Sequence, residues 1–191
     1  MKTRDIDIRS VLMTKLSREH SNEEDVLILD ELGVCQGEAR IDVAVINGAM
    51  NGYEIKSESD TLERLPRQTE AYNRVFDTVT LVVSEKYIED VREKIPPWWG
   101  ILRVKANARG NIILYRERRA NKNKMIDPYA IAQLLWRDEA IELLKKRGLH
   151  KGLMSKPREY IWKALAENVP KKELQYEVRC VLKSRKSWRV H

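Results

Sequence analysis

The chain has 191 residues, enough for one domain of ordinary size, with or without an appendage, that buries a sizeable core. Its 36 Lys and Arg residues outnumber its 29 Asp and Glu residues, and the resulting net charge of +7 favours polyanionic partners such as nucleic acid. No apolar run approaches the roughly 18 residues of a spanning helix, and the charged start MKTRDIDIR is unlike a signal peptide, so we expect a cytoplasmic protein with no membrane association.

The N-terminal segment is predicted to form a packing helix over residues 4–19. Apolar side chains recur there at helical spacing, and Thr3 precedes them as a candidate cap. The apolar positions are Ile8, Val11, Leu12 and Leu16. A strand is expected within DVLILDELGV, residues 25–34, and the turn CQGE then leads toward a second strand.

Two half-buried strands are expected to form a hairpin in the middle of the core. Alternating apolar residues in EARIDVAVI predict the first strand, GYEIK predicts the second, and the Asn-Gly dipeptide between them is a turn signal. Folding the hairpin about Gly48 places Asp42 opposite Glu54. The same register places Arg40 opposite Lys56.

Glu54 and Lys56 lie two residues apart on a strand, so their side chains share one face of the sheet. Taken alone, this pattern fits a surface ion pair, which contributes at most about 1 kcal/mol. The facing carboxylates of Asp42 and Glu54 argue instead for a site, because like charges that meet across a ladder destabilise it. A divalent cation reverses that interaction, and Mg²⁺ binds one or two carboxylates while keeping positions for water and phosphate.

The spacing D-x11-E-x-K, formed by Asp42, Glu54 and Lys56, resembles the PD-(D/E)XK nuclease superfamily, including its RecB-like and Holliday-junction-resolvase-like branches. Those families tend to carry a Gln and a Tyr four residues apart on the helix after the ExK strand. The segment RQTEAY supplies Gln68 and Tyr72 at this spacing, which places both on one helical face. The QxxxY pattern is common in helices, and Tyr72 in isolation would be interpreted as an aromatic residue at the edge of the core.

The resemblance covers residues 26–104, and the stretch NGYEIKSESDTLERLPRQ is similar to a bacterial group within the superfamily. No PD dipeptide precedes the hairpin, because Asp42 lies in RIDVAV; this departure is common in the superfamily. The resemblance implies an α/β fold of the restriction-endonuclease-like type, with a mixed central sheet flanked by helices. It also implies a metal-dependent nuclease that hydrolyses phosphodiester bonds, with DNA as the expected substrate.

The expected site contains one cation and five supporting side chains. Asp42, Glu54 and the main-chain carbonyl of Ile55 would hold Mg²⁺, with Mn²⁺ as a substitute. Lys56 would assist the attacking water or stabilise the transition state. The resemblance implies that Gln68 and Tyr72 support the geometry of the site.

An additional acidic ligand has two candidate sources. Folding the first two strands about residues 36 and 37 would place Glu31 opposite Asp42, where it could become a third carboxylate near the metal. The superfamily usually supplies such a residue from an N-terminal helix, so Glu19, Glu23 and Glu24 are alternatives.

The remaining helices and strands of the core are predicted from capping residues, apolar runs and turn residues. Asp60 with Glu63 fits a helix capping box, and Pro66 suits the opening of the helix that carries Gln68. A buried strand over 77–83 and an amphipathic helix over 84–95 complete a β-α-β-α order, and GILRV with NIILY is predicted to form a further hairpin. The pair Trp98-Trp99 is expected to cap the core, with base stacking as the alternative.

Beyond the core, residues 116–124 (RERRANKNK) are basic and polar and are predicted to form a solvated linker or loop. A long helix over 127–149 should begin at Asp127-Pro128 and end at Gly148, followed by two shorter helices, the first capped by Ser155 and ending near Pro170. This organisation divides the chain into a nuclease-like core over 1–115, the linker, and a helical subdomain over 125–191. A plain helical subdomain is the simpler interpretation, and a winged or helix-turn-helix DNA grip is the alternative.

A second functional class shares the same fold. In a non-catalytic module that binds nucleic acid or protein, the carboxylates would be surface charges and the basic tail would hold the partner. The intact D…ExK pattern favours the enzyme. Either function is compatible with a monomer or a homodimer.

Overall fold

Six strands form one mixed sheet whose spatial order follows the order of the chain. The computed structural model describes residues 4–185. The strands β1 to β3 form an antiparallel meander, β3 to β5 run parallel, and β6 returns antiparallel to β5. Their bounds are Leu27–Val34, Ala39–Ile46, Met50–Lys56, Thr78–Ser84, Gly100–Ala106 and Ile112–Arg118 for β1 to β6.

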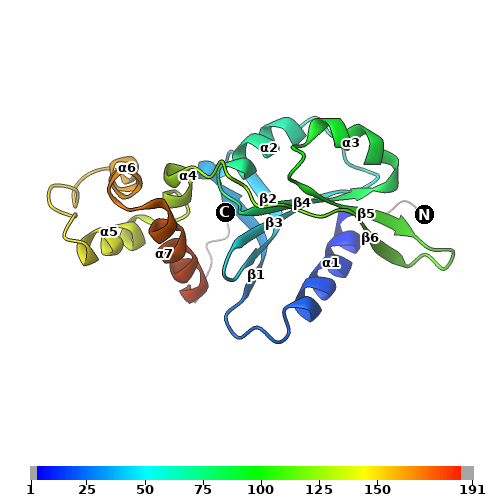
Figure 1. Ribbon diagram of the computed structural model, residues 1–191, viewed down its shortest axis with the longest axis horizontal. Helices are drawn as coiled ribbons and strands as arrows, with labels where there is room; N and C mark the ends of the chain where they lie inside the picture. The colour runs from blue at the N-terminus through cyan, green and yellow to red at the C-terminus, as the bar shows by residue number, and fades with distance from the viewer. Residues whose placement is uncertain (1–3, 186–191) are drawn as a thin grey trace.

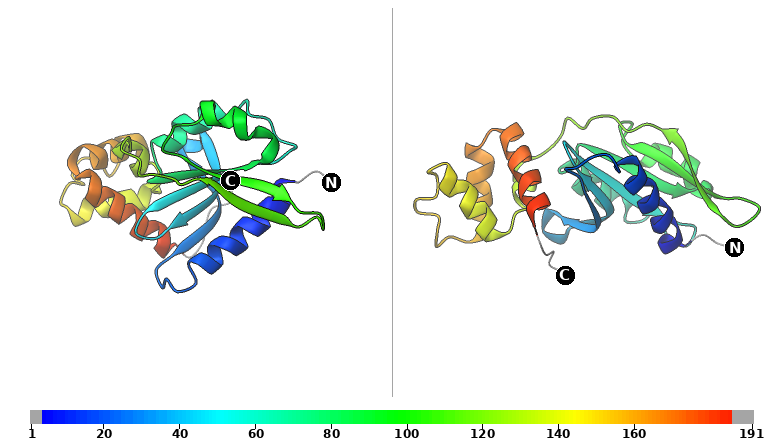
Figure 2. Two further views of the ribbon diagram at one scale, coloured as in Figure 1. Left: turned by 45° about the vertical axis from the view of Figure 1, so that its right-hand side comes forward. Right: turned by 90° about the horizontal axis from the view of Figure 1, so that it is seen from below.

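Helices cover both faces of the sheet, as Figures 1 and 2 show. The helix α1 (Asp5–Glu19) buries Ile8, Leu12 and Leu16 against one face. On the other face lie α2 (Leu65–Asn73) and α3 (Ile88–Lys94). Because both faces are covered, the central strand β4 is buried without interruption over its last four residues, from Leu81 to Ser84, as is usual for parallel strands. The predicted mixed central sheet flanked by helices is therefore confirmed.

The register predicted for the hairpin of β2 and β3 is confirmed where the two strands pair. Val43 pairs with Tyr53, and Ile46 pairs with Met50 next to the turn. The described pairing ends at Val43 and Tyr53, so the predicted cross-strand pair of Arg40 and Lys56 does not form. The side chain of Arg40 turns instead toward β1.

The C-terminal helices lie beside the sheet and share its larger core cluster (Figure 2). The single helix predicted over 127–149 is wrong, because the chain breaks it into α4 (Pro128–Ala132) and α5 (Arg137–Lys146). The break has a local cause: the Glu139 carboxylate accepts the Trp136 N–H at 2.7 Å and so starts a new helix. α6 (Arg158–Asn168) and α7 (Lys171–Ser184) follow as predicted.

The predicted helix ends have mixed outcomes. Asp127 caps α4 by accepting the Tyr129 N–H at 2.9 Å, and Gly148 takes a left-handed φ of 70° just after α5. Asp60 does not cap α2, because its carboxylate accepts the N–H and the hydroxyl of Ser57 and closes the turn after β3. Ser155 does not cap α6, which begins after Pro157. The candidate cap Thr3 lies outside the described residues.

The segment that joins the sheet to the helices is a loop over residues 119–124 and is mostly exposed there, as predicted, but it is anchored at two points. The first residues of the predicted linker belong to β6, and Asn123 is buried with its Nδ2 donating to the carbonyls of Asn73 and Phe76. Trp99 is buried and stacks on Tyr72, which confirms the core interpretation of the tryptophan pair for this residue. Within residues 4–185, no helix combines the length and the apolar character needed to cross a membrane.

Candidate active site

β3 carries Glu54 and Lys56 into the space beneath α2, where both side chains are buried. Only 2% of Glu54 and 3% of Lys56 is exposed, and Lys56 Nζ lies 2.7 Å from Glu54 Oε1. A surface ion pair is therefore the wrong description of the EIK segment. Burying two charges is costly unless they are paired and further hydrogen-bonded, and such an arrangement is typical of functional sites.

α2 supplies the two side chains that complete the surroundings of Glu54. Gln68 Nε2 donates to Glu54 Oε1 at 2.6 Å. Tyr72 Oη lies 2.7 Å from Glu54 Oε2 and also 2.7 Å from the carbonyl oxygen of Arg40, so its single proton serves one acceptor at a time. The structure thus brings together four of the predicted residues, Glu54, Lys56, Gln68 and Tyr72. Gln68 Oε1 is buried without a partner, which leaves an acceptor beside the carboxylate.

Asp42 joins the group from β2 through the backbone of β3. Its Oδ2 accepts the N–H of Ile55 at 2.6 Å, where a backbone carbonyl would otherwise be the acceptor. This hydrogen bond fixes the Asp42 carboxylate next to the residue between Glu54 and Lys56. The predicted proximity of Asp42 and Glu54 thus arises from a side chain inserted between the strands and not from a regular cross-strand pair.

Burial and proximity change the acid-base properties of these groups. Burial raises the pKa of Glu54 to about 7, and the nearby Asp42 carboxylate acts in the same direction while Lys56 opposes it. Burial also raises the pKa of Asp42, although the Ile55 N–H and Arg9 counteract it. The pKa of Tyr72 is raised by burial and by Glu54. A buried carboxylate whose charge is disfavoured by a second carboxylate nearby forms a site that a divalent cation would stabilise.

Glu31 does not become the third carboxylate. It takes a left-handed backbone with φ of 59°, and its Oε2 lies 3.2 Å from Arg40 Nη1. The left-handed backbone at Glu31 changes which side chains of the two strands face the core at this level. Leu29 and Leu32 therefore enter the same core cluster although they are three residues apart. The register of β1 with β2 is the predicted one, and the local backbone turns the Glu31 side chain away.

The alternative acids of the N-terminal region lie elsewhere. Glu19 pairs with Lys15 on the surface of α1. Glu23 accepts from Asn47 at 3.0 Å, in the turn at the far end of the hairpin from Lys56. Glu24 is exposed. None of the three therefore joins the described site.

Arg9 of α1 occupies the place where an additional acid was expected, and sequence reasoning missed it. Its Nη2 lies 2.8 Å from Asp42 Oδ1, and its Nη1 lies 2.6 Å from Asp30 Oδ1. The same guanidinium also contacts Asp5, one turn earlier on α1. Asp5 and Arg9 are spaced i and i+4, so the pair could have been read from the sequence. Its contact with Asp42 depends on how α1 packs on the sheet.

The donor set fits Mg²⁺ better than a metal that needs a protein cage. Within residues 4–185 there is no group of three or more Asp, Glu, His or Cys side chains arranged to hold a metal. Mg²⁺ is commonly bound by one or two carboxylates and keeps several waters. Asp42 and Glu54 could supply those two, with the Ile55 carbonyl between them in the chain.

Comparison with known proteins places the chain in a family. A family model described as Bacteriophage P4 protein cII matches residues 1–189. The chain belongs to this family. A curated relative, protein cII of Enterobacteria phage P4, is 31% identical over 83 residues, which make up 44% of this chain and 31% of that protein. The aligned part is thus under a third of the length of the P4 protein, and no solved structure matches the chain.

Proposed function

We propose that this member of the cII family is a metal-dependent nuclease with a restriction-endonuclease-like fold, which hydrolyses phosphodiester bonds in DNA. The observation that carries the proposal is the buried Glu54, which contacts Lys56, Gln68 and Tyr72 at once. These are the residues of the ExK and QxxxY patterns. Gln68 follows Glu54 by 14 positions in the chain and Tyr72 follows it by 18, yet both side chains contact its carboxylate. A non-functional surface would not bury this set of polar groups.

Each side chain has a role that its contacts support. Asp42, Glu54 and the Ile55 carbonyl would hold Mg²⁺, which when bound activates water and offsets charge on the scissile phosphate. Gln68 and Tyr72 hold the Glu54 carboxylate in one orientation, as residues behind a metal ligand do. Lys56 places an ammonium at this carboxylate, where it can orient a water or stabilise negative charge on the phosphate.

The function is tested by incubating the purified protein with linear, circular, single-stranded and branched DNA, with Mg²⁺, with Mn²⁺ and with a chelator. We expect cleavage that requires the metal and stops in chelator. Tight binding without cleavage of any substrate would favour the non-catalytic module. One observation supports that alternative, because Arg9 and Lys56 already neutralise the two carboxylates in the structure.

The contact of Arg9 with Asp42 leads to a prediction for metal binding. A cation and the Arg9 guanidinium compete for the same carboxylate, so Arg9→Ala should raise Mg²⁺ affinity by about three- to tenfold, at most about 1.4 kcal/mol. The readout is the melting temperature as a function of Mg²⁺ concentration. In wild type, Mg²⁺ at ten times its Kd should add about 1.4 kcal/mol to the free energy of unfolding.

Arg4→Ala is the matched control for this titration. Arg4 directly precedes α1, and its guanidinium pairs with Asp7 at 3.1 Å instead of with the site. Its Mg²⁺ response should equal that of wild type, whereas Glu54→Gln should lose most of the response. Equal Mg²⁺ responses of wild type, Arg9→Ala and Glu54→Gln would show that the cation binds outside this site.

A further inference from the structure

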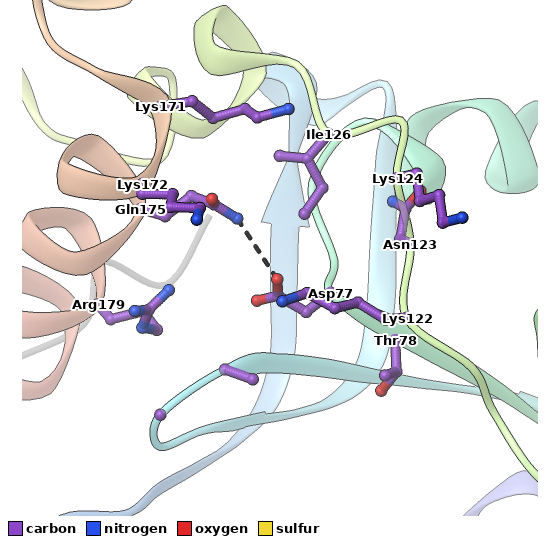
Figure 3. A pocket seen from close by; sticks show the side chains of 12 residues that line it. Asp77, Thr78, Lys122, Asn123, Lys124, Ile126, Lys171, Lys172, Gln175 and Arg179 are labelled. Atoms are coloured by element: carbon purple, nitrogen blue, oxygen red, sulfur yellow. Dashed lines mark hydrogen bonds between the residues drawn. The ribbon is translucent and has the colours of Figure 1, made fainter.

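A basic cleft lies between α7 and the end of the sheet where β3 and β4 begin (Figure 3). Its volume is about 490 Å³. Four separate parts of the chain line it: the turn between β2 and β3 at Gly48, the start of β4 at Asp77, the anchored segment around Asn123, and one side of α7. The cleft therefore exists only when the helical region is packed beside the sheet.

Five cationic side chains gather around this cleft, and Figure 3 shows them arranged on both of its sides. In the part of the chain that the structure describes, none of the five forms an ion pair with a carboxylate. Other cationic side chains of the same helical region do form ion pairs, Lys145 with Glu142 and Arg147 with Glu177. The five cations of the cleft are Lys122, Lys124, Lys171, Lys172 and Arg179.

The one carboxylate in the lining does not neutralise this charge. Asp77 Oδ2 accepts the N–H of Met50 at 2.8 Å, and Asp77 Oδ1 accepts from Gln175 Nε2 at 3.4 Å, the contact drawn in Figure 3. These bonds tie the start of β4 to β3 and to α7. The carboxylate thus has a structural role, and the cleft keeps an excess of four positive charges, since five cations face one acid.

The chemistry of the lining selects one class of partner. Like charges held together repel each other, and a polyanion relieves that repulsion while releasing its own counterions. Lysine ammonium groups contact phosphates as point charges. The lining contains no aromatic side chain on which a base could stack. Recognition in this cleft would therefore concern the backbone of a nucleic acid and not its base sequence.

The cleft and the candidate active site lie at opposite ends of the same two parallel strands. Thr78 at the cleft pairs with Asn51, and Leu81 pairs with Glu54, three residues further along. Three residues of strand span about 10 Å. One strand of duplex DNA carries a phosphate about every 3.4 Å along the helix axis, so this separation corresponds to roughly three phosphates.

We infer that this cleft binds backbone phosphates of the nucleic acid strand that is cleaved at Glu54, a few nucleotides from the scissile bond. The inference deepens the proposed function and rests on it for the identity of the strand as substrate. Phosphate binding by the cleft itself does not require catalysis, so the two can be tested separately.

The test measures DNA binding by the full-length protein in chelator, by fluorescence anisotropy with labelled duplex and single-stranded oligonucleotides over a range of salt. The cleft variant is Lys171→Ala/Lys172→Ala/Arg179→Ala. The control variant, Lys146→Ala/Lys151→Ala/Lys163→Ala, removes the same charge from exposed positions outside the lining. The cleft variant should bind at least about tenfold more weakly, with a salt slope smaller by about 2 to 3, and the control within about threefold of wild type.

A second cleft variant, Lys122→Ala/Lys124→Ala, changes a different element and should also weaken binding, with circular dichroism confirming that each variant folds. Equal affinity and salt slope in wild type and in both folded cleft variants would overturn the inference, as would wild type that binds no nucleic acid. Binding through the cleft without metal-dependent cleavage would leave the cleft standing and defeat the proposed nuclease. If the cleft variants bind DNA normally and metal-dependent cleavage persists, the proposed nuclease stands and the phosphate-binding role of the cleft is wrong.

Discussion

Replacing Lys56 with methionine should reduce Mg²⁺-dependent DNA cleavage by about 10²- to 10³-fold, the usual contribution of one positioned group that stabilises charge in the transition state. The ammonium of Lys56 is buried and lies 2.7 Å from Glu54, so no solvent cation can take its place without rearranging the site. DNA binding in chelator should change by no more than a few-fold, because one phosphate contact among several carries little of the affinity. The measurement is single-turnover cleavage with protein in excess.

Lys94→Met is the control for this loss of activity. Lys94 is exposed at the end of α3, and its replacement removes the same charge from a surface helix. The control should cleave like wild type. If Lys56→Met cleaves at the wild-type rate while folded, the assignment of the ExK segment to catalysis is wrong. If both variants lose activity equally, the effect reflects net charge and not the site.

The parts of the site that follow from strand periodicity could be predicted from the sequence. Alternation with a period of two and an Asn-Gly turn fix the register of β2 and β3 up to the pair of Val43 and Tyr53. Asp42 therefore comes directly after the last pair, within reach of the Ile55 N–H. The helix that follows β3 packs over it, which places Gln68 and Tyr72 at Glu54. These inferences need only local periods and a short connection.

The parts that depend on one unusual backbone angle could not be predicted in the same way. Glu31 lies opposite Asp42 in register, yet its left-handed φ of 59° removes it from the site. Glycine or asparagine would have signalled such an angle, and glutamate does not. The break between α4 and α5 is similar, because the sequence from Pro128 to Lys146 keeps helical periodicity while Glu139 starts a second helix.

The contact of Arg9 with Asp42 is a third kind of feature, which the sequence could not predict because it joins two elements that are distant in the chain. The residues are 33 positions apart, and nothing in their spacing predicts contact. The apolar positions of α1 predict the face that packs on the sheet, but not the position of the helix along it. The cation beside Asp42 is therefore a finding of the structure, and it makes metal affinity depend on α1.

The second large effect concerns stability and needs no substrate. Removing one member of a buried ion pair leaves the other charge without compensation, which costs about 3–5 kcal/mol. Glu54→Gln and Lys56→Met should each approach that loss, because Glu54 and Lys56 are 2% and 3% exposed. Urea unfolding in chelator at pH 8 gives the free energies, and this pH lies above the pKa of about 7 that burial produces for Glu54.

The double variant Glu54→Gln/Lys56→Met separates the interaction energy of the pair from the effect of losing each residue alone. With both charges removed, no uncompensated charge remains, so the double variant should be no less stable than either single variant, and the coupling energy should be about 2–3 kcal/mol. Arg92 and Glu89, an exposed pair on α3 at 3.7 Å, provide the comparison cycle. An exposed pair should couple by less than about 1 kcal/mol. If the Glu54–Lys56 coupling is equally small, the pair is solvated in solution, Lys56 is free to leave the carboxylate, and the site loses the burial on which its role in catalysis depends.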